Sequence, residues 1–202
     1  DIYFAFPPSE NQLTANDFSK YSRFIINKNI EENEPILINN LTEENIRFQI
    51  KEIVTNICEI INKSNLTVPE DVDLEISHHY GIENFKKFGL SMITVINREY
   101  CKKILILLPG QCHPEQYHKQ KEETFHVLWG EGILIINDKK YNLYAGAVHT
   151  ILPNQRHYFE SKNGIIIEEI SSTHFKNDSF YTDKKIMENK DRKTLLTHWR
   201  IS

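Results

Sequence analysis

The stretch that decides the fold runs from Gly110 to Gly130 and reads "GQCHPEQYHKQKEETFHVLWG". Glycine stands at both ends, and histidines and glutamates are concentrated between them. Two interpretations are open. The stretch is either a solvated, charge-rich turn between two strands or one half of a metal site, because imidazole and carboxylate groups are common ligands of divalent ions.

The sequence around this stretch is rich in strands. From Leu74 onward, short apolar runs alternate with turn residues, as is typical of β-structure. The runs are "LSMITVIN", "KKILILLPG", "TFHVLWGEGILIIND", "KKYNLYAG", "HTILPNQRHYF" and "NGIIIEEIS". Phe125, Val127 and Trp129 alternate with polar or smaller neighbours, as a barrel strand requires. Several strands at this spacing predict a β-sandwich or barrel.

The N-terminal part of the chain has a different pattern. "LTEENIRFQIKEIVTNICEIINKS" repeats isoleucine every three or four residues, which predicts an amphipathic helix over residues 42–63. Thr42 is expected to cap it, and Glu43 and Glu44 suit the positive end of the helix dipole. Before it, "FIINKNIEENEPILINN" reads as two short extended pieces around a turn, and after it "NLTVPED" reads as a linker.

These patterns predict one α+β chain that is mainly β. An N-terminal extension of short strands and the helix occupies residues 1–73, and a barrel with a C-terminal tail occupies residues 74–202. The isoleucine stripe is too apolar to stay exposed, so we expect it to pack on the barrel or on a second subunit of a homodimer.

Composition excludes several classes of function. A formal charge of −4 and a pI near 6.2 give no sign of a basic face, so we expect no nucleic-acid partner. The longest apolar run, "ILILLP", is far too short to span a membrane, and no charged-then-apolar leader opens the chain, so no membrane partner is expected. Cys58, Cys101 and Cys112 form no CxxC pair, which suits reduced thiols in a cytoplasmic protein.

The spacing inside the opening stretch is specific. Gly110, Gln116, His118, Glu123 and Gly130 fall in the register G(X)5HXH(X)4E(X)6G, which resembles the first motif of the cupin superfamily, with Gln116 in place of the first histidine. The second cupin motif, G(X)5PXG(X)2H(X)3N, can be laid on a later segment, where its glycine and histidine are kept. Its positions there are Gly146, Leu152, Asn154, His157 and Ser161. The resemblance implies a jelly-roll β-barrel.

The ligand chemistry agrees with this resemblance. Residues two apart on a strand point to the same side, so Gln116 and His118 would both face the barrel interior, and a hairpin can bring Glu123 and His157 to the same point. We therefore predict one divalent ion (Mn, Zn, Fe, Co or Ni) bound by His118, Glu123 and His157, with Gln116 as a weaker fourth ligand. No organic cofactor is expected.

The flanks narrow the resemblance to D-lyxose isomerases and related cupin sugar isomerases. In "PGQCHPEQYHKQKEETF", Lys121 and Glu123 match a K-x-E arrangement after the metal histidine, and Lys103 falls on a lysine that the family places beside the substrate. "EEISSTHFKNDSFY" resembles the family's E-V-S segment and its Asp-rich loop. The resemblance therefore implies aldose–ketose isomerisation of a small sugar, with Glu169 and Asp178 as acid and base, although on the strand "IIIEEIS" either Glu168 or Glu169 could face solvent.

Other functions remain open. The runs "LEISHHYGIENF" and "DRKTLL" also resemble a cupin module at the C-terminal end of some N-acetylneuraminate synthase-like proteins, which implies a sugar-binding or regulatory role in nonulosonate biosynthesis. A metal-dependent dioxygenase or lyase and a structural dimerisation domain are further alternatives.

Several conspicuous residues are expected to lie away from the metal. His78 and His79 are interpreted as a surface turn beside Gly81, and His113 as a rim residue offset from the ligand register. The tail with Tyr181, Asp183 and Trp199 either covers the barrel mouth or meets a second subunit.

Overall fold

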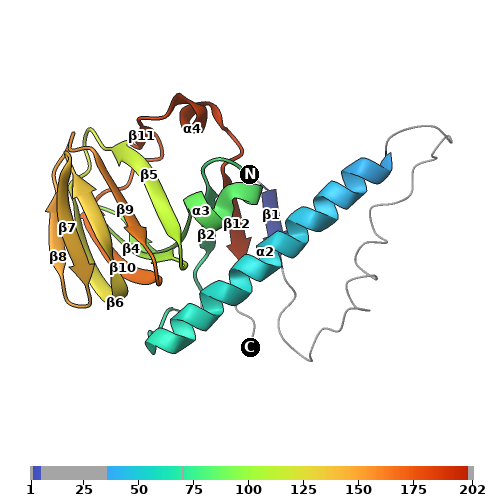
Figure 1. Ribbon diagram of the computed structural model, residues 1–202, viewed down its shortest axis with the longest axis horizontal. Coiled ribbons are helices and arrows are strands. Elements are labelled where there is room, and N and C mark those ends of the chain that lie inside the picture. Colours follow the sequence, from blue (N-terminus) through green and yellow to red (C-terminus); the bar gives the residue numbers. More distant parts are fainter. Residues whose placement is uncertain (1, 6–35, 70, 200–202) are drawn as a thin grey trace.

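The computed structural model describes residues 2–5, 36–69 and 71–199 as a strongly curled β-sheet with one long helix along its outer side (Figure 1). The helices are α2 (Ile36–Ser64), the 3-10 turn η2 (Ile82–Asn84), α3 (Phe85–Phe88) and α4 (Lys184–Glu188). The first strands are β1 (Ile2–Ala5), β2 (Leu74–His78), β3 (Gly89–Asn97), β4 (Tyr100–Leu107), β5 (Gln111–Tyr117) and β6 (Glu123–Ile136). The others are β7 (Lys139–Tyr144), β8 (Val148–Ile151), β9 (His157–Ser161), β10 (Ile165–Ser172), β11 (Phe180–Tyr181) and β12 (Lys193–Thr197).

The sheet curls because one long strand belongs to both of its halves. The order is β1-β12-β2-β3-β4-β10-β6-β9-β5-β11, and β7 and β8 also pair with β6. The first half of β6 pairs with β8 and β10, and the second half pairs with β7 and β9. Gly130 lies between the halves with φ +82°, and a Cβ there would come within 2.3 Å of the Gly164 carbonyl oxygen, so only glycine suits this bend. The predicted mainly β barrel is confirmed.

Strands β4 and β10 are buried on both faces, which explains their continuous apolar runs. Ile104, Ile106 and Ile166 pack toward α2, and the residues between them face the barrel interior. The interior cluster consists of Leu90, Leu105, Leu107, Phe125, Val127, Leu134, Ile136, Leu143, Ala147, Ile151, Phe159, Ile165 and Ile167. Because the side chains alternate, Lys103 and Glu169 lie on the interior side of the same two strands.

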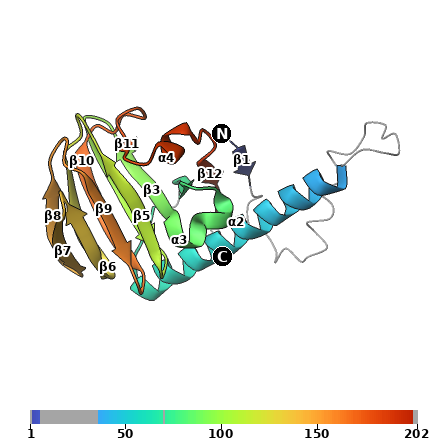
Figure 2. The same ribbon diagram turned by 45° about the horizontal axis from the view of Figure 1, so that its top comes forward.

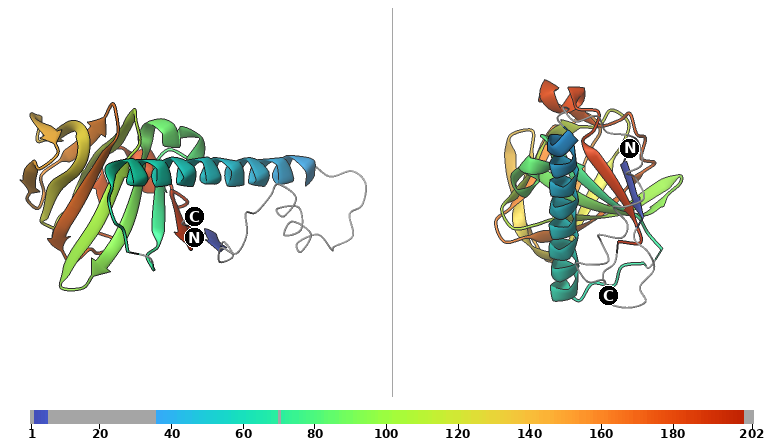
Figure 3. Two further views of the ribbon diagram at one scale, coloured as in Figure 1. Left: turned by 90° about the horizontal axis from the view of Figure 1, so that it is seen from below. Right: turned by 90° about the vertical axis from the view of Figure 1, so that its right-hand side faces the viewer.

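Helix α2 packs on the barrel through the predicted isoleucine stripe. Ile50, Ile53, Ile57 and Ile60 are buried in one cluster with residues of β2, β3, β4 and β10, and Ile46 packs against it. Figure 3 shows the helix crossing one side of the barrel and continuing beyond it. Among the described residues, no helix is long and apolar enough to cross a membrane.

The predicted start of this helix was wrong. The helix begins at Ile36, so Thr42 is not its cap, and the first turn contains no acidic residue to meet the dipole. Residues 36–40 are therefore helical rather than extended, and the rest of the expected pair of extended pieces lies outside the described residues. The predicted linker after the helix is confirmed, because residues 66–69 form no helix or strand.

The C-terminal tail returns across the barrel. Strand β11 pairs with β5, α4 follows it, and β12 joins the sheet between β1 and β2 (Figure 2). Trp199 is buried in the cluster beneath α2, and its indole N–H donates to the Val72 carbonyl at 2.9 Å. The tail thus forms both a sheet edge and a cover over one end of the barrel.

Candidate metal centre

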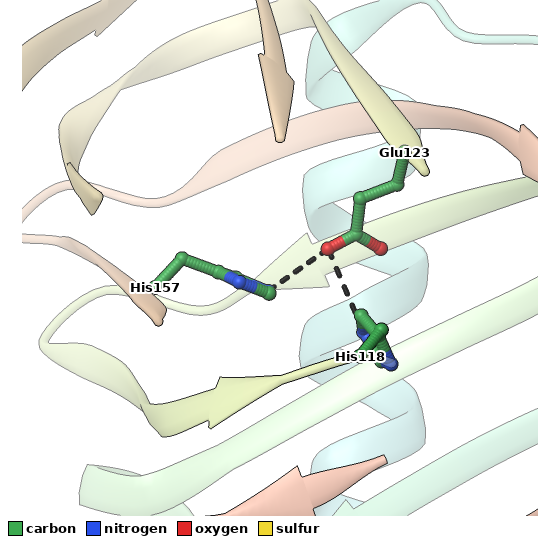
Figure 4. A group of neighbouring side chains, drawn as sticks. All are labelled: His118, Glu123 and His157. Atoms are coloured by element: carbon green, nitrogen blue, oxygen red, sulfur yellow. Dashed lines mark ion pairs between the residues drawn. The ribbon is translucent and has the colours of Figure 1, made fainter. Parts of the chain in front are cut away.

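His118, Glu123 and His157 meet inside the barrel (Figure 4). His118 follows the end of β5, and Glu123 and His157 are the first residues of β6 and β9. Their ligand atoms all lie within 4.8 Å of one another, and all three side chains are buried. Glu123 Oε1 is 2.9 Å from His157 Nε2 and 3.6 Å from His118 Nε2. Residues far apart along the chain therefore present two nitrogens and an oxygen to one point.

Backbone contacts set the tautomers of both histidines. His118 Nδ1 lies 2.5 Å from the Asp178 carbonyl oxygen, and His157 Nδ1 lies 3.1 Å from the Gln155 carbonyl oxygen. A carbonyl only accepts hydrogen bonds, so each Nδ1 carries the proton and donates. In the neutral imidazole the lone pair is then on Nε2, which is the atom that faces Glu123 in both cases.

This arrangement fits a cation. Two Nε2 lone pairs and a carboxylate oxygen are all acceptors, and His118 Nε2 and Glu123 Oε1 make no hydrogen bond of acceptable geometry. Burial raises the pKa of Glu123, but Lys121 and the histidines outweigh it and hold that pKa well below its ordinary value. Burial lowers the pKa of His118. An ionised carboxylate beside unprotonated imidazole suits a divalent ion with mixed N/O ligands.

Gln116 lies close to these ligands. Its side chain is buried in the cavity, and its Nε2 is 3.5 Å from His157 Nε2. Rotation of the amide would present its oxygen instead, because the two ends of an amide have the same shape. Gln116 therefore lies beside His157, within the group of candidate ligands.

A cavity adjoins the centre and contains two carboxylates, Glu123 and Glu169. Lys121 bridges them, with its Nζ 2.5 Å from Glu123 Oε2 and 2.9 Å from Glu169 Oε1. Lys103 lies opposite Glu169 in the β4–β10 register and also lines the cavity. Glu168 points to the other face, where it pairs with Lys102 at 2.6 Å. The strand alternation thus decides which of the two neighbouring glutamates is internal.

Charge pairing keeps the internal groups ionised. Burial raises the pKa of Glu169, but Lys121 and Lys103 outweigh it and lower that pKa. Burial lowers the pKa of Lys121, and the two glutamates outweigh it and raise that pKa above its ordinary value. Glu169 is therefore an anion with a cation on either side.

Asp178 is buried but does not line the cavity. Its carboxylate accepts hydrogen bonds from the backbone N–H groups of Lys119, Gln120 and Lys121 at 2.9–3.3 Å. The backbone carbonyl of Asp178 accepts a hydrogen bond from His118 Nδ1. Asp178 therefore holds the loop between β5 and β6 that carries His118 and Lys121.

Two sequence interpretations were wrong. His113 is not a rim residue: it is 2% exposed and lines the cavity. Strand β5 has an extra residue between His113 and Gln116 relative to β9, and this bulge lets both side chains face inward. Pro114, within the bulged segment, was the available signal, because proline within a sheet is confined to edges and bulges.

His79 lies in a turn, as predicted, but the turn does not expose it, because both His78 and His79 are buried. His79 Nδ1 donates to the Phe88 carbonyl at 2.6 Å, so its Nε2 accepts from the Tyr181 hydroxyl at 3.0 Å. Burial lowers the pKa of His79 to about 4. The tail residue Tyr181 is thus anchored to the barrel and lines the cavity.

The tail closes the cavity. His174, Lys176, Ser179 and Tyr181 line it from the segment between β10 and α4, and the free space inside is about 40 Å³. That space accommodates a few water molecules. A sugar therefore needs more room than this closed cavity offers.

Comparisons with known proteins agree with this site. Residues 103–164 match the family model described as "Cupin domain". This segment contains all the proposed ligands, the two glycines of the first motif and the bend at β6, and its jelly-roll fold agrees with the match.

The chain is also similar to individual sugar isomerases. The chain is 28% identical over 171 residues to a D-lyxose/D-mannose isomerase from Thermosediminibacter oceani, covering 69% of this chain and 94% of the relative. It is 26% identical to a D-lyxose ketol-isomerase from Cohnella laeviribosi, covering 67% and 91%. Among solved structures, the ligand-free L-ribose isomerase of Cellulomonas parahominis superposes with a TM-score of 0.59 at 12% identity, covering 70% of this chain and 94% of that one, which shows the shared fold.

Proposed function

We propose that this chain is a metal-dependent aldose–ketose isomerase that acts on a small sugar. The observation that carries the proposal is that the two cavity carboxylates face different groups. Glu123 faces the two histidines, whereas Glu169 lies outside this ligand group in the same cavity and is available for proton transfer. The D-lyxose isomerase relatives support the same reaction class.

The reaction needs a base, a proton carrier and compensation of negative charge. Moving the carbonyl from C1 to C2 breaks the C2–H bond, forms a C1–H bond and transfers the O2 hydroxyl proton to O1. His118, Glu123 and His157, with Gln116 as an additional candidate, would hold one divalent ion. When bound, that ion would polarise the sugar oxygens and offset the charge that develops on them.

The protein's own groups supply the remaining steps. Glu169 is ionised and would take the C2 proton and return it to C1. Lys121, 2.9 Å from Glu169, and Lys103, opposite it on β4, would stabilise the developing oxyanion. Asp178 would act as a positioning residue through the loop rather than as an acid or base.

Three further assignments belong to this proposal. The barrel with its tail, residues 74–202, is the catalytic unit, and residues 1–73 are an extension, of which helix α2 packs on the barrel. The chain forms a homodimer, supported by Phe48, which is 68% exposed on α2. A cytoplasmic location is supported by Cys58, Cys101 and Cys112, which form no disulfide with one another.

A binding module without turnover, as in a nonulosonate synthase, is the second candidate. The replacement of a ligand histidine by Gln116 favours it, because an amide is a weaker ligand than imidazole. The protein should therefore be loaded with each of the candidate metals and given a panel of aldoses and ketoses in deuterium oxide. Isomerisation with deuterium entering at C2 or C1, or hydrogen passing between them, supports the enzyme. Sugar binding without isomerisation supports the module, and oxygen consumption with Fe(II) supports a dioxygenase.

A further inference from the structure

The cavity has a second set of charged side chains that the isomerisation does not use. Lys176, Arg192 and Lys193 line it from the C-terminal tail, at a distance along the chain from the metal ligands. Lys176 is exposed, and Arg192 and Lys193 are half-buried, so this set lies toward solvent. The proton-transfer groups, by contrast, are buried.

Two of these three cations have no acidic partner in the described part of the chain. Lys193 pairs with Glu75 at 2.8 Å. No carboxylate of the described residues lies within ion-pair distance of Lys176 or Arg192, although the chain as a whole carries a net charge of −4. The carboxylates of the cavity, Glu123 and Glu169, are already paired with Lys121.

The cavity is therefore positive before any ion is bound. Its lining contains five lysine or arginine side chains and two glutamates, and a divalent ion at the histidines would add to the excess. This excess positive charge attracts a neutral sugar only weakly. It attracts an anionic group as that group approaches, and the bound anion can accept charge-assisted hydrogen bonds.

Arg192 is held in place without a carboxylate. Its guanidinium carbon lies 5.2 Å from the centre of the Tyr181 ring, and its backbone carbonyl accepts from His78 N at 2.8 Å. The Tyr181 hydroxyl is in turn fixed by His79. Stacking on an aromatic ring orders the guanidinium and leaves its N–H groups available to two oxygens of one ligand.

We propose that the sugar carries an anionic substituent, a phosphate or a carboxylate, and that Arg192 and Lys176 bind it. This inference rests on the proposed isomerase function for the identity of the rest of the ligand. Because Lys176 belongs to the segment that closes the cavity and Arg192 is fixed to β2, an anion bound by both would hold that segment over the substrate.

The test compares one aldose in three forms: neutral, phosphorylated at the carbon farthest from C1, and oxidised there to a carboxylate. Each is assayed with the metal-loaded protein. We expect kcat/KM for one anionic form to exceed that for the neutral form by about a hundredfold, and the form that does so identifies the substituent. Arg192→Gln should reduce this preference by about tenfold or more. Lys190→Gln removes the same charge at an exposed position outside the cavity and should leave the preference unchanged.

A binding measurement separates this inference from the function itself. Calorimetry with a sugar-alcohol phosphate, which cannot isomerise, should show binding that Arg192→Gln weakens and Lys190→Gln does not. Suppose that a neutral sugar is isomerised as well as its anionic forms, and that Arg192→Gln changes neither the ratio of their kcat/KM values nor the affinity for the sugar-alcohol phosphate. The anion site is then refuted and the isomerase stands. If no sugar is isomerised but the phosphate binds through Arg192, the anion site stands and the isomerase fails.

Discussion

Lys103 and Glu169 lie directly opposite each other on the paired strands β4 and β10, and both side chains face the cavity. Their neighbours Lys102 and Glu168 lie diagonally across the same strands, opposite Ile170 and Ile104, and form an ion pair on the outer face. The same two strands therefore carry one lysine and one glutamate on each side. This duplication provides matched controls, because each internal residue has an external neighbour of the same type.

The first prediction uses that control. Glu169→Gln keeps the shape and the hydrogen bond to Lys121 but removes the base, so turnover should fall by about a hundredfold or more with metal content unchanged. Glu168→Gln should lose less than about threefold, since it removes only a partly exposed surface pair. Both are measured as kcat beside metal content. Equal activity of Glu169→Gln and the parent would rule out Glu169 as the base.

The second prediction concerns metal binding. The wild-type protein should contain one equivalent of a divalent ion after reconstitution, and His157→Ala should contain almost none while keeping its circular dichroism spectrum. His149→Ala, at a histidine on β8 outside the centre, should keep the ion. Elemental analysis decides, and a His157→Ala protein with full metal content would show that the ligand set is wrong.

The third prediction tests the replaced ligand. Gln116→His should tighten metal binding by about tenfold, because imidazole is a better donor to these ions than an amide. Competition with a chelator measures the change. Unchanged affinity would mean that position 116 does not reach the ion.

The fourth prediction concerns Asp178 and pH. Burial raises the pKa of Asp178, but its hydrogen bonds from Lys121, Lys119 and Gln120 outweigh it and lower that pKa. Stability from this carboxylate is therefore present above the ordinary Asp pKa of about 3.9 and is lost as pH falls through the lower folded value.

Asp178→Asn should accordingly lower the free energy of unfolding at neutral pH by about 1–3 kcal/mol, with a smaller difference from the parent in acid. Metal affinity should fall by about tenfold as the loop loosens. Asp138→Asn removes a charge in the β6–β7 turn and should change neither quantity. A pH-independent difference between parent and Asp178→Asn would contradict this account.

The fifth prediction concerns assembly. Light scattering at tens of micromolar should give a homodimer, and Phe48→Ser should shift it toward monomer by removing an exposed aromatic side chain from α2. Glu44→Ser, at another exposed position of the same helix, is the control. A clean monomer for the wild type would remove the dimer from the proposal.

The sequence by itself determined the strands, the helix stripe and the meeting of the three candidate ligands. Runs such as "ILILL" and "III" predict strands because each strand needs apolar side chains on the faces it buries. Ile50, Ile53 and Ile57 repeat at the helical period because they line the buried face of the helix. His118, Glu123 and His157 could be predicted because motif spacing on paired strands brings their positions together.

Only the tertiary structure decided the rest, because it depends on contacts between residues far apart in the chain. A bulge in β5 turned His113 inward, and the tail buried His79 by placing Tyr181 against it. Asp178, grouped by sequence with the acids and bases, instead meets three backbone N–H groups of a distant loop. Local periodicity predicts which face of a helix or strand is apolar. It does not predict which polar group of another segment will contact that helix or strand.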